Sequence, residues 1–406
     1  MYLNFAWRYF RAKKSTHAIN IIAWVTTGVI AFATCCQILV LSVFNGFEDL
    51  VKSLYSSFYA DMKIVPANGK TFVLTPQKIT ELSSNTSVDY LSLIVEEKAL
   101  IQNGESQTIL QLKGVDHNYK YVCGISANIK KGKYDLGNAE NPFLIVGAGL
   151  QNAAGISMNE ALGPERLAVI LPKTNNSSND PLETLSEGII SPSGVFSIQQ
   201  DFDNAYAITN IDFVKQQMGM RDNTFSAAEI KLKPAVNDKD TKAALTKILG
   251  DRFIIKNRYE QNSNLYNTMK TEKWAIYLVL TLILIIAAFN MISALSMLVL
   301  EKKQDIAILN SMGATFGQIR NIFLAEGLLL GIIGTVIGII LAATISLLQI
   351  HFKFIKIEGG SFLVDYFPVK AIATDYLLVT FTSLVIVVIA SWIPSIKAAR
   401  HKSTLA

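Results

Sequence analysis

One short polar stretch separates two long apolar segments of this chain: Glu301-Lys302-Lys303-Gln304-Asp305-Ile306-Ala307-Ile308-Leu309-Asn310-Ser311-Met312-Gly313-Ala314-Thr315. The flanking segments, 275–300 and 322–350, each exceed the roughly 20 apolar residues that span a bilayer, so the stretch is expected at a membrane surface. Charges come first, apolar residues then recur at helical spacing, and a glycine stands where a helix would end. In order, these residues are Glu301, Lys302, Asp305, Ile306, Leu309, Met312 and Gly313. The pattern predicts a short amphipathic helix on the cytoplasmic side.

The apolar residues are concentrated in blocks. They make up 50% of the 406 residues and gather in four segments, namely 19–44, 275–300, 322–350 and 376–393. No block has a charge near its middle, and Glu326, a few residues into the third block, is expected to reach the interface. We therefore predict a helical membrane protein with four transmembrane helices and a large α+β extracytoplasmic domain inserted between the first and second helices.

Basic residues alternate between the loops that join these blocks. The net charge is +5, and its carriers outside the long 46–273 segment include Arg8, Arg11, Lys13, Lys14, Lys302, Lys303, Arg320, Lys397, Arg400 and Lys402. By the positive-inside rule, both termini and the short middle loop are cytoplasmic and the long segment is outside. This distribution argues against nucleic acid as a partner.

The first apolar block reads as an uncleaved anchor. It is longer than the h-region of a signal peptide, and no small-x-small cleavage site follows it. Cys35 and Cys36 lie inside this block, so Cys123 is the single external cysteine and is expected to be a small buried apolar residue.

These observations give a predicted order of parts. They are an interfacial amphipathic helix (1–17), transmembrane helix 1 (18–46), the outside domain (47–272), transmembrane helix 2 (273–300), a cytoplasmic helix and loop (301–321), transmembrane helix 3 (322–350), a short outside loop (351–375), transmembrane helix 4 (376–396) and a cytoplasmic tail (397–406).

The outside domain is long enough to bury its own core. A hairpin is predicted at Asn103-Gly104 between the β-rich runs 92–102 and 106–115. The segment 172–192, rich in Asn, Ser and Pro, is expected to be a loop or a boundary inside the domain, and 238–249 a helix. The mixture indicates an α+β domain.

Four glycines of the third block share one helical face. They are Gly327, Gly331, Gly334 and Gly338, at spacings of four, three and four. Small residues at such spacing let another helix approach closely. The sequence leaves open whether that helix belongs to the same chain or to a second subunit.

Catalytic and metal-binding signatures are not found. The sequence has no Gly-x-x-x-x-Gly-Lys-Ser/Thr motif, so the chain is not expected to hydrolyse nucleotide or to be an enzyme, and its four histidines are dispersed without a metal-binding context. We expect no catalytic and no metal residues. Asp201-Phe202-Asp203 is interpreted as a solvated turn. The spans also lack mid-membrane acids or histidines of the kind that ion-coupled transport requires.

Both ends of the chain resemble a known family, the permease subunits of lipoprotein-releasing ABC transporters. These belong to the mechanotransmission permeases, which include macrolide exporters and cell-division permeases. The residues that carry the resemblance are Leu41 to Glu48 (LSVFNGFE), Lys270 to Lys273 (KTEK), Ala287 to Ser293 (AAFNMIS), Lys303 to Leu309 (KQDIAIL), Met312 to Ala314 (MGA), Asp365 to Val369 (DYFPV) and Ile393 to Arg400 (IPSIKAAR). The chain departs from the family at Asn310, where a basic residue is common.

The resemblance implies a fold of one span, a large periplasmic domain and three further spans. It implies a second permease copy or a paralogue as a dimer partner, and two copies of a separate ATPase subunit that binds ATP and Mg²⁺. The chain itself is then expected to bind no cofactor. The stretch 301–315 becomes a coupling helix, a lever fixed to two spans that can pass ATPase movement into the membrane.

The implied function is release of lipoproteins from the bacterial inner membrane toward a periplasmic carrier. Candidate cargo contacts are apolar groups at the outer ends of the first two spans: Leu41, Val43, Phe44, Phe47, Ile276 and Leu280. One alternative keeps the fold but assigns drug or peptide efflux, or control of a cell-wall enzyme. A membrane receptor is an alternative of another class, although no cytoplasmic segment is long enough for an output domain.

Overall fold

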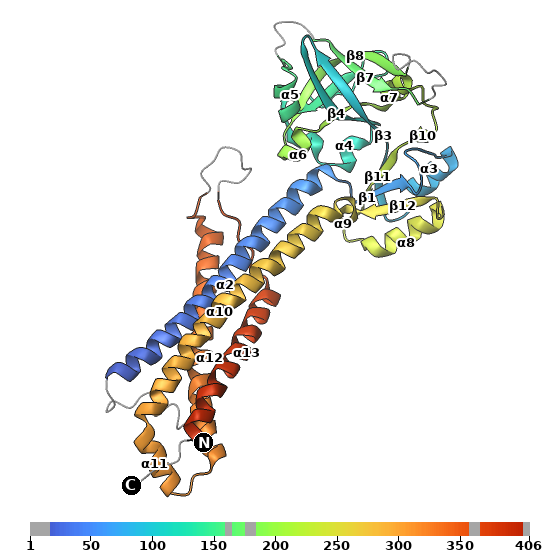
Figure 1. The fold of residues 1–406 in the computed structure, drawn as a ribbon. Helices are drawn as coiled ribbons and strands as arrows, with labels where there is room; N and C mark the ends of the chain where they lie inside the picture. The colour runs from blue at the N-terminus through green and yellow to red at the C-terminus, as the bar shows by residue number, and fades with distance from the viewer. Residues whose placement is uncertain (1–16, 159–164, 175–183, 357–365, 401–406) are drawn as a thin grey trace. The chain divides into compact units, whose positions relative to one another are not determined.

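The computed structural model describes residues 17–158, 165–174, 184–356 and 366–400 (Figure 1). The chain divides into two compact units: a membrane unit of Met1–Leu50 and Asn267–Ala406, and a sheet unit of Val51–Tyr266. The interfacial helix predicted over 1–17 lies, except for its last residue, outside the described residues.

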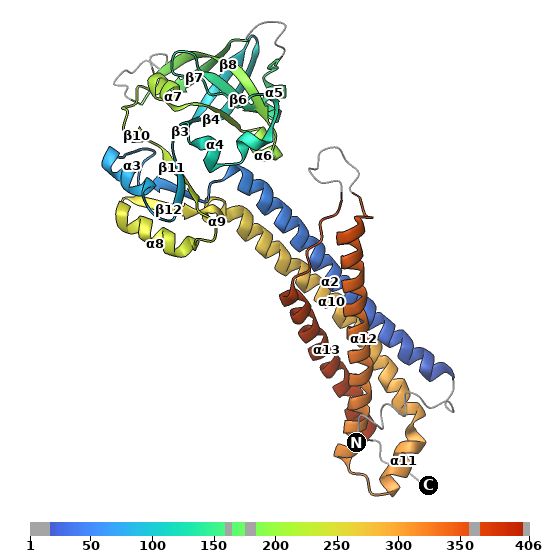
Figure 2. The same cartoon turned by 180° about the vertical axis from the view of Figure 1, so that it is seen from behind.

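Four long helices form the membrane unit. They are α2 (His17–Phe58), α10 (Ser263–Glu301), α12 (Phe316–Phe352) and α13 (Ala373–Ala399). Each is long and apolar enough to cross a membrane. They run side by side in Figures 1 and 2, and the short helix α11 (Lys303–Ser311) connects α10 to α12 at one end of the bundle. The prediction of four membrane helices is confirmed.

The ends of these helices differ from the predicted limits. The limits of the outside domain, 47 and 272, fall inside α2 and α10, because α2 continues to Phe58 and α10 already begins at Ser263. Likewise, α13 covers 373–399 where 376–396 was expected. Hydropathy identifies only the apolar part of a helix, which lies in the lipid. The backbone hydrogen bonds of the helix continue through polar residues beyond that part.

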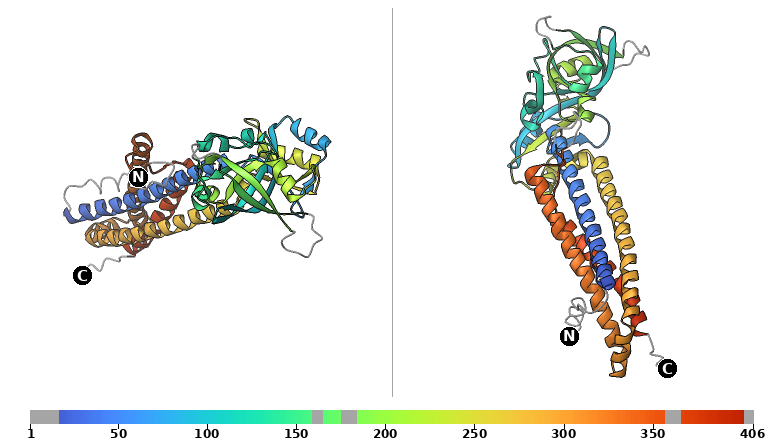
Figure 3. Two further views of the ribbon diagram at one scale, coloured as in Figure 1. Left: turned by 90° about the horizontal axis from the view of Figure 1, so that it is seen from above. Right: turned by 90° about the vertical axis from the view of Figure 1, so that its left-hand side faces the viewer.

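The sheet unit is built around a closed ring of strands. Ten strands form one sheet in the order β12-β1-β11-β3-β4-β9-β6-β8-β5, with β7 bonded to both β3 and β8. Because β7 bridges these two, the strands β3, β4, β9, β6, β8 and β7 close into a barrel. The right-hand view of Figure 3 shows them curving into a ring.

The ring combines antiparallel and parallel pairs: β4 with β9 and β6 with β8 are parallel, and the other ring pairs are antiparallel. The strands are β1 (Met62–Pro66), β2 (Phe72–Val73), β3 (Val88–Asn103), β4 (Ser106–Val115), β5 (Ile129–Gly132), β6 (Phe143–Gly147), β7 (Leu167–Pro172), β8 (Leu185–Phe196), β9 (Tyr206–Asn210), β10 (Thr224–Phe225), β11 (Ala227–Leu232) and β12 (Phe253–Asn257). The helices of the unit are α3 (Pro76–Ser83), α4 (Tyr119–Val122), η1 (Ile125–Asn128), α5 (Ala148–Ala153), α6 (Gln200–Asp203), α7 (Ile211–Met218), α8 (Asp238–Leu249) and α9 (Arg258–Gln261).

Local sequence signals predicted part of this unit. The β3–β4 hairpin turns through Gly104 and Glu105, directly after Asn103, and Gly104 has a φ of +57°, a conformation that glycine adopts without strain. The helix predicted over 238–249 is α8. The loop predicted over 172–192 is wrong for residues 185–192, which belong to β8. Its Pro and Ser residues suggest a loop, but pairing with β7 and β6 holds it as a strand.

Two apolar clusters fill the sheet unit. The first contains side chains from all six ring strands, among them Val95, Leu112, Leu144, Val169, Val195 and Ala207, and it continues to residues outside the ring such as Met62 and Leu245. The second receives the last turns of α2: Tyr55 and Phe58 are buried there, and the Phe58 ring stacks on Phe202 with centroids 4.1 Å apart.

A buried charge network lies beside this second cluster. The Lys113 ammonium donates to Glu229 Oε1 at 2.7 Å and to Tyr119 Oη at 2.8 Å, and the two charged side chains are only 2% and 1% exposed. Lys63 pairs with Glu96 at 3.0 Å and lies 3.6 Å from Glu229. Burial alone would lower the pKa of the Lys63 ammonium, but these two carboxylates raise it above its ordinary range. Since buried charges are tolerated only when paired, the network fixes how these strands and α4 meet.

Candidate functional site

The short helix α11 ends as the sequence indicates. The N–H of Gly313 donates to the carbonyl of Asn310 and the N–H of Ala314 to that of Leu309, both at 3.0 Å, which is the Schellman pattern. Gly313 has a φ of +89°, a conformation that glycine adopts without strain. A capping box of Thr315 and Gln318 then starts α12 at once. The turn between α11 and α12 is therefore tight.

Three of the predicted coupling residues carry charge at the start of α11. Lys302 is the N-cap residue, and its ammonium lies 3.3 Å from Asp305 in the first helical turn. Glu301, the last residue of α10, is exposed. A carboxylate in the first turn is favoured by the helix dipole, so Asp305 stabilises the beginning of α11.

The apolar face predicted to meet an ATPase is in part turned inward. Ile306 is 2% exposed and packs in a cluster with Leu298, Val299, Ile319, Phe323 and Ala398 of α10, α12 and α13. Leu309 is only partly exposed. The expectation that Ile306 faces a partner is wrong, because this side chain anchors α11 to its own chain.

A different apolar pair of α11 faces outward. Ile308 is 59% and Met312 79% exposed, and Gln304, one turn before them, is also exposed. These three residues, spaced by four, form one stripe of the helical surface, which we call the α11 outer stripe. Met312 was among the predicted residues, but Ile308 was missed, although the spacing of four was present in the sequence.

The four glycines of α12 pack against other helices of the same chain. A Cβ at Gly327 or Gly331 would overlap Ser391 or Val387 of α13. A Cβ at Gly334 would lie 2.8 Å from the carbonyl oxygen of Thr27, and one at Gly338 would lie 2.6 Å from that of Ala31, both in α2. The predicted face thus splits into two contacts, with α13 at one end and α2 at the other. The sequence left open whether the glycines meet a helix of the same chain or of a second subunit, and in the structure they meet helices of the same chain.

The candidate cargo contacts are only partly accessible. Leu41 is 1% exposed and packs with Ile38, Ala342 and Val379, so its expected role as a contact is wrong. The Phe47 ring meets the edge of Phe367 at a centroid distance of 5.9 Å. The remaining candidates, Val43, Phe44, Ile276 and Leu280, are partly exposed.

Residues that the sequence analysis did not single out are more exposed on the same part of α10. The exposed fractions of Trp274, Leu278 and Leu282 are 56%, 69% and 54%. They follow one another at intervals of four and so form an apolar stripe along one helical face.

Glu326 lies inside the helix bundle. Its side chain is 4% exposed and its Oε2 has no hydrogen-bond partner within the described residues. The expectation that Glu326 reaches the membrane interface is wrong. The neighbouring Gly327 packs directly on α13, so this turn of α12 lies inside the bundle.

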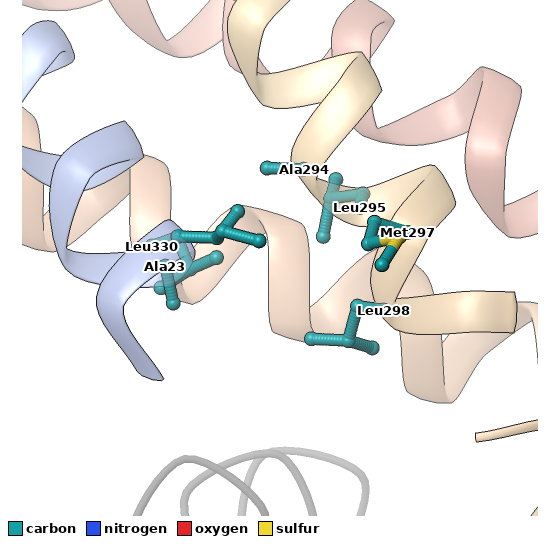
Figure 4. A pocket seen from close by; sticks show the side chains of 7 residues that line it. Ala23, Ala294, Leu295, Met297, Leu298 and Leu330 are labelled. Atoms are coloured by element: carbon teal, nitrogen blue, oxygen red, sulfur yellow. The ribbon is translucent and has the colours of Figure 1, made fainter. Parts of the chain in front are cut away.

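Figure 4 shows a small apolar pocket in the membrane unit. It is lined by side chains of α2, α10 and α12, among them Ala23, Leu295 and Leu330. Its volume is about 10 Å³, which is close to the minimum for one water molecule. The pocket is therefore too small for a lipid chain.

Acidic residues of the sheet unit have structural partners. Asp203 is 7% exposed and accepts hydrogen bonds from the N–H of Ile198 and the hydroxyl of Ser197, so the expected solvated turn is wrong for this residue. Asp201 accepts from Tyr55 Oη at 2.9 Å. Within the described residues, no group of three or more His, Cys, Asp or Glu is placed to hold a metal ion.

Comparison with known proteins adds a sequence relationship to this geometry. Residues 277–403 match the family model described as FtsX-like permease C-terminal. The lipoprotein-releasing system transmembrane protein LolC of Xylella fastidiosa is 25% identical over 403 residues, covering 97% of this chain and 95% of the relative. LolE of Haemophilus influenzae, named as a protein of the same system, is 23% identical over 407 residues, covering 97% and 96%.

Solved structures align with a part of the chain. The periplasmic region of MacB from Actinobacillus actinomycetemcomitans matches 54% of this chain and 98% of that chain, at 14% identity and a TM-score of 0.38. The extracellular domain of the ABC-type transporter YknZ matches 48% and 99%, at 13% identity and a TM-score of 0.33.

Proposed function

Because the chain belongs to the lipoprotein-releasing ABC permease family of FtsX-like proteins, we propose that it is the permease subunit of a transporter that releases lipoproteins from the bacterial inner membrane. The observation that carries this proposal is similarity to LolC over 97% of the chain, which includes both the membrane unit and the sheet unit. The products would pass to a lipoprotein carrier in the periplasm.

The energetics of the cargo require an external source of work. A lipoprotein anchor buries tens of methylene groups in the bilayer, each contributing about 0.8 kcal/mol. Since the sequence has no P-loop, ATP and Mg²⁺ would bind to a separate ATPase subunit. By family resemblance, two ATPase copies would serve a dimer of this chain with a second copy or a paralogue.

The α11 outer stripe is the surface we propose for the ATPase. It offers two exposed apolar side chains, Ile308 and Met312, on a helix whose opposite face is anchored by Ile306. A helix fixed in this way transmits a push at its exposed face to α10, α12 and α13 as a lever. The charges of Lys302 and Asp305 lie at the start of the same helix, and Glu301 ends the preceding helix α10.

The cargo surface we propose is the exposed apolar part of α10. Trp274, Leu278 and Leu282 could accept acyl chains along the membrane, together with the partly exposed Ile276 and Leu280. Val43, Phe44 and Phe47 of α2 would be secondary contacts, whereas the buried Leu41 would not take part.

Membrane orientation gives a direct prediction. With Cys35, Cys36 and Cys123 replaced, an impermeant thiol reagent added outside should label a cysteine at Asn68, which is exposed in the sheet unit. It should not label one at Gln304 in α11 or at Ser403, because the positive-inside rule places both in the cytoplasm. Labelling at Gln304 in intact cells would reverse the proposed orientation.

Purification from native membranes tests the proposed function. We expect the tagged chain to bring down an ABC ATPase together with lipoproteins or their carrier, identified by mass spectrometry. Recovery of the ATPase with a drug-efflux adaptor or a cell-wall hydrolase, and without lipoproteins, would contradict the proposal.

A further inference from the structure

Three polar side chains join the outer ends of α2, α10 and α13. Asn45 Nδ2 donates to Asp375 Oδ2 at 2.7 Å, and the Lys273 ammonium donates to Asn45 Oδ1 at 2.8 Å and to Asp375 Oδ2 at 2.9 Å. Asn45 is 2% and Asp375 8% exposed. We call these three residues the outer clamp. Each contributes one corner of a closed hydrogen-bonded triangle, so a shift of any one helix would leave buried polar groups unpaired.

The outer clamp continues into a polar stripe of α10. Lys273, Tyr277 and Thr281 are spaced by four, and all three side chains bond to other helices of the chain. Tyr277 shares a hydrogen bond with Thr382 of α13, and Thr281 accepts one from Gln37 of α2 at 3.1 Å. The exposed stripe of Trp274, Leu278 and Leu282 begins one residue later and therefore lies on a different face of α10.

A segment before α13 closes over the same end of α2. The N–H of Lys370 donates to the carbonyl of Ser42 at 2.9 Å. Gly46 lies so close to the carbonyl of Pro368 that a Cβ would overlap it. Backbone contacts thus add to the side-chain contacts between α2 and the start of α13.

From this geometry we propose that the outer clamp holds α2, α10 and α13 of one chain together as a single block throughout the transport cycle. A lipid anchor would then pass along the outward apolar stripe of α10 and not between α2 and α10 of the same chain. Asn45, Lys273 and Asp375 are positioning residues in this scheme, because they keep the block rigid while it is moved. The cargo part of the inference rests on the proposed function, whereas the rigidity of the block does not.

Charge substitution tests the contribution of the clamp to release. In the full complex, Asp375→Asn or Lys273→Met should lower the rate of lipoprotein release by roughly tenfold or more. Lys273→Met leaves the Asp375 carboxylate, whose side chain is 11% exposed, without its cation, and Asp375→Asn leaves the 27% exposed Lys273 without its anion. ATP hydrolysis should continue, since α11 is untouched. The matched control is Lys370→Met, whose partner Asp49 and own side chain are 56% and 49% exposed, so that little should change.

A charge swap separates a specific clamp from general instability. The double variant Lys273→Asp with Asp375→Lys should recover release, because the Asn45 amide can turn over and exchange its donor and acceptor sides. Unchanged release in both single variants, or no recovery in a well-folded swap, would overturn the role of the clamp.

A distance measurement tests rigidity without reference to cargo. Spin labels at Val40 of α2 and Leu278 of α10, both exposed, would be introduced into the cysteine-free full chain and diluted with unlabelled chain in the ATPase complex. We expect the same distance distribution in the nucleotide-free and vanadate-trapped states. A shift between these states would overturn the inference. If the distance is constant but the wild-type complex releases no lipoprotein, the proposed function fails while the rigid block stands.

Discussion

Replacing both Ile308 and Met312 by aspartate is expected to separate the permease from its ATPase. Ile308 in α11 and Met312, the residue that caps its C-terminal end, are 59% and 79% exposed. A carboxylate buried without a partner in a protein interface costs several kcal/mol, so two of them should weaken the complex by roughly a thousandfold or more. The variant should insert and fold normally, yet yield no ATPase on purification.

The control for this experiment uses the same chemistry at a distance. Val73 and Ile254 in the sheet unit are 62% and 45% exposed, and their double aspartate variant should retain the ATPase. Ile306 is unsuitable as a target, because its truncation to alanine would open its own packing cluster at a cost of about 2–5 kcal/mol. If the Ile308 and Met312 double variant keeps the ATPase and releases lipoprotein at the normal rate, the α11 outer stripe is not the docking surface.

Leucine at Gly331 or Gly338 is expected to disrupt the helix bundle itself. At Gly331 even a Cβ would overlap Val387, and at Gly338 it would lie 2.6 Å from the backbone oxygen of Ala31. The larger side chain must push α13 or α2 away, which costs about 1–3 kcal/mol or more at each site. The thermal stability of the purified permease in detergent should fall clearly, and release should fall with it.

Gly28 provides the matched control for the glycine experiment. It also lies in a membrane helix, but a Cβ there would meet nothing within 4 Å. Gly28→Leu should therefore leave stability and release nearly unchanged. Equal tolerance of leucine at Gly28, Gly331 and Gly338 would contradict the packing of α12 on its neighbours.

The helices of the membrane unit could be predicted from the sequence, but the faces through which they pack on one another could be predicted only in part. The spacing of Gly331 and Gly338 correctly indicated close packing, because a missing side chain is visible in the sequence. That one glycine meets α13 and the other α2 depends on the arrangement of the bundle. Similarly, Ile306 and Ile308 are chemically alike, and only the position of α11 against α10, α12 and α13 decides which is buried.

The sheet unit shows the same limit at a larger scale. The β3–β4 hairpin is a local structure and followed from Asn103-Gly104. The barrel depends on pairs far apart in the chain, such as β4 with β9 and β3 with β7, which no local pattern specifies. The outer clamp was missed for the same reason, because Asn45, Lys273 and Asp375 look like ordinary polar residues at helix ends until the fold joins them.

The most direct measurement of the central claim is ATP-driven release from proteoliposomes. The purified permease and its copurified ATPase would be reconstituted with a triacylated lipoprotein and supplied with a soluble lipoprotein carrier outside. We predict that lipoprotein appears in the soluble fraction with ATP and Mg²⁺, but not with a non-hydrolysable analogue or with the Ile308 and Met312 double aspartate variant. Active ATP hydrolysis by the wild-type complex with no lipoprotein leaving the membrane would contradict the account.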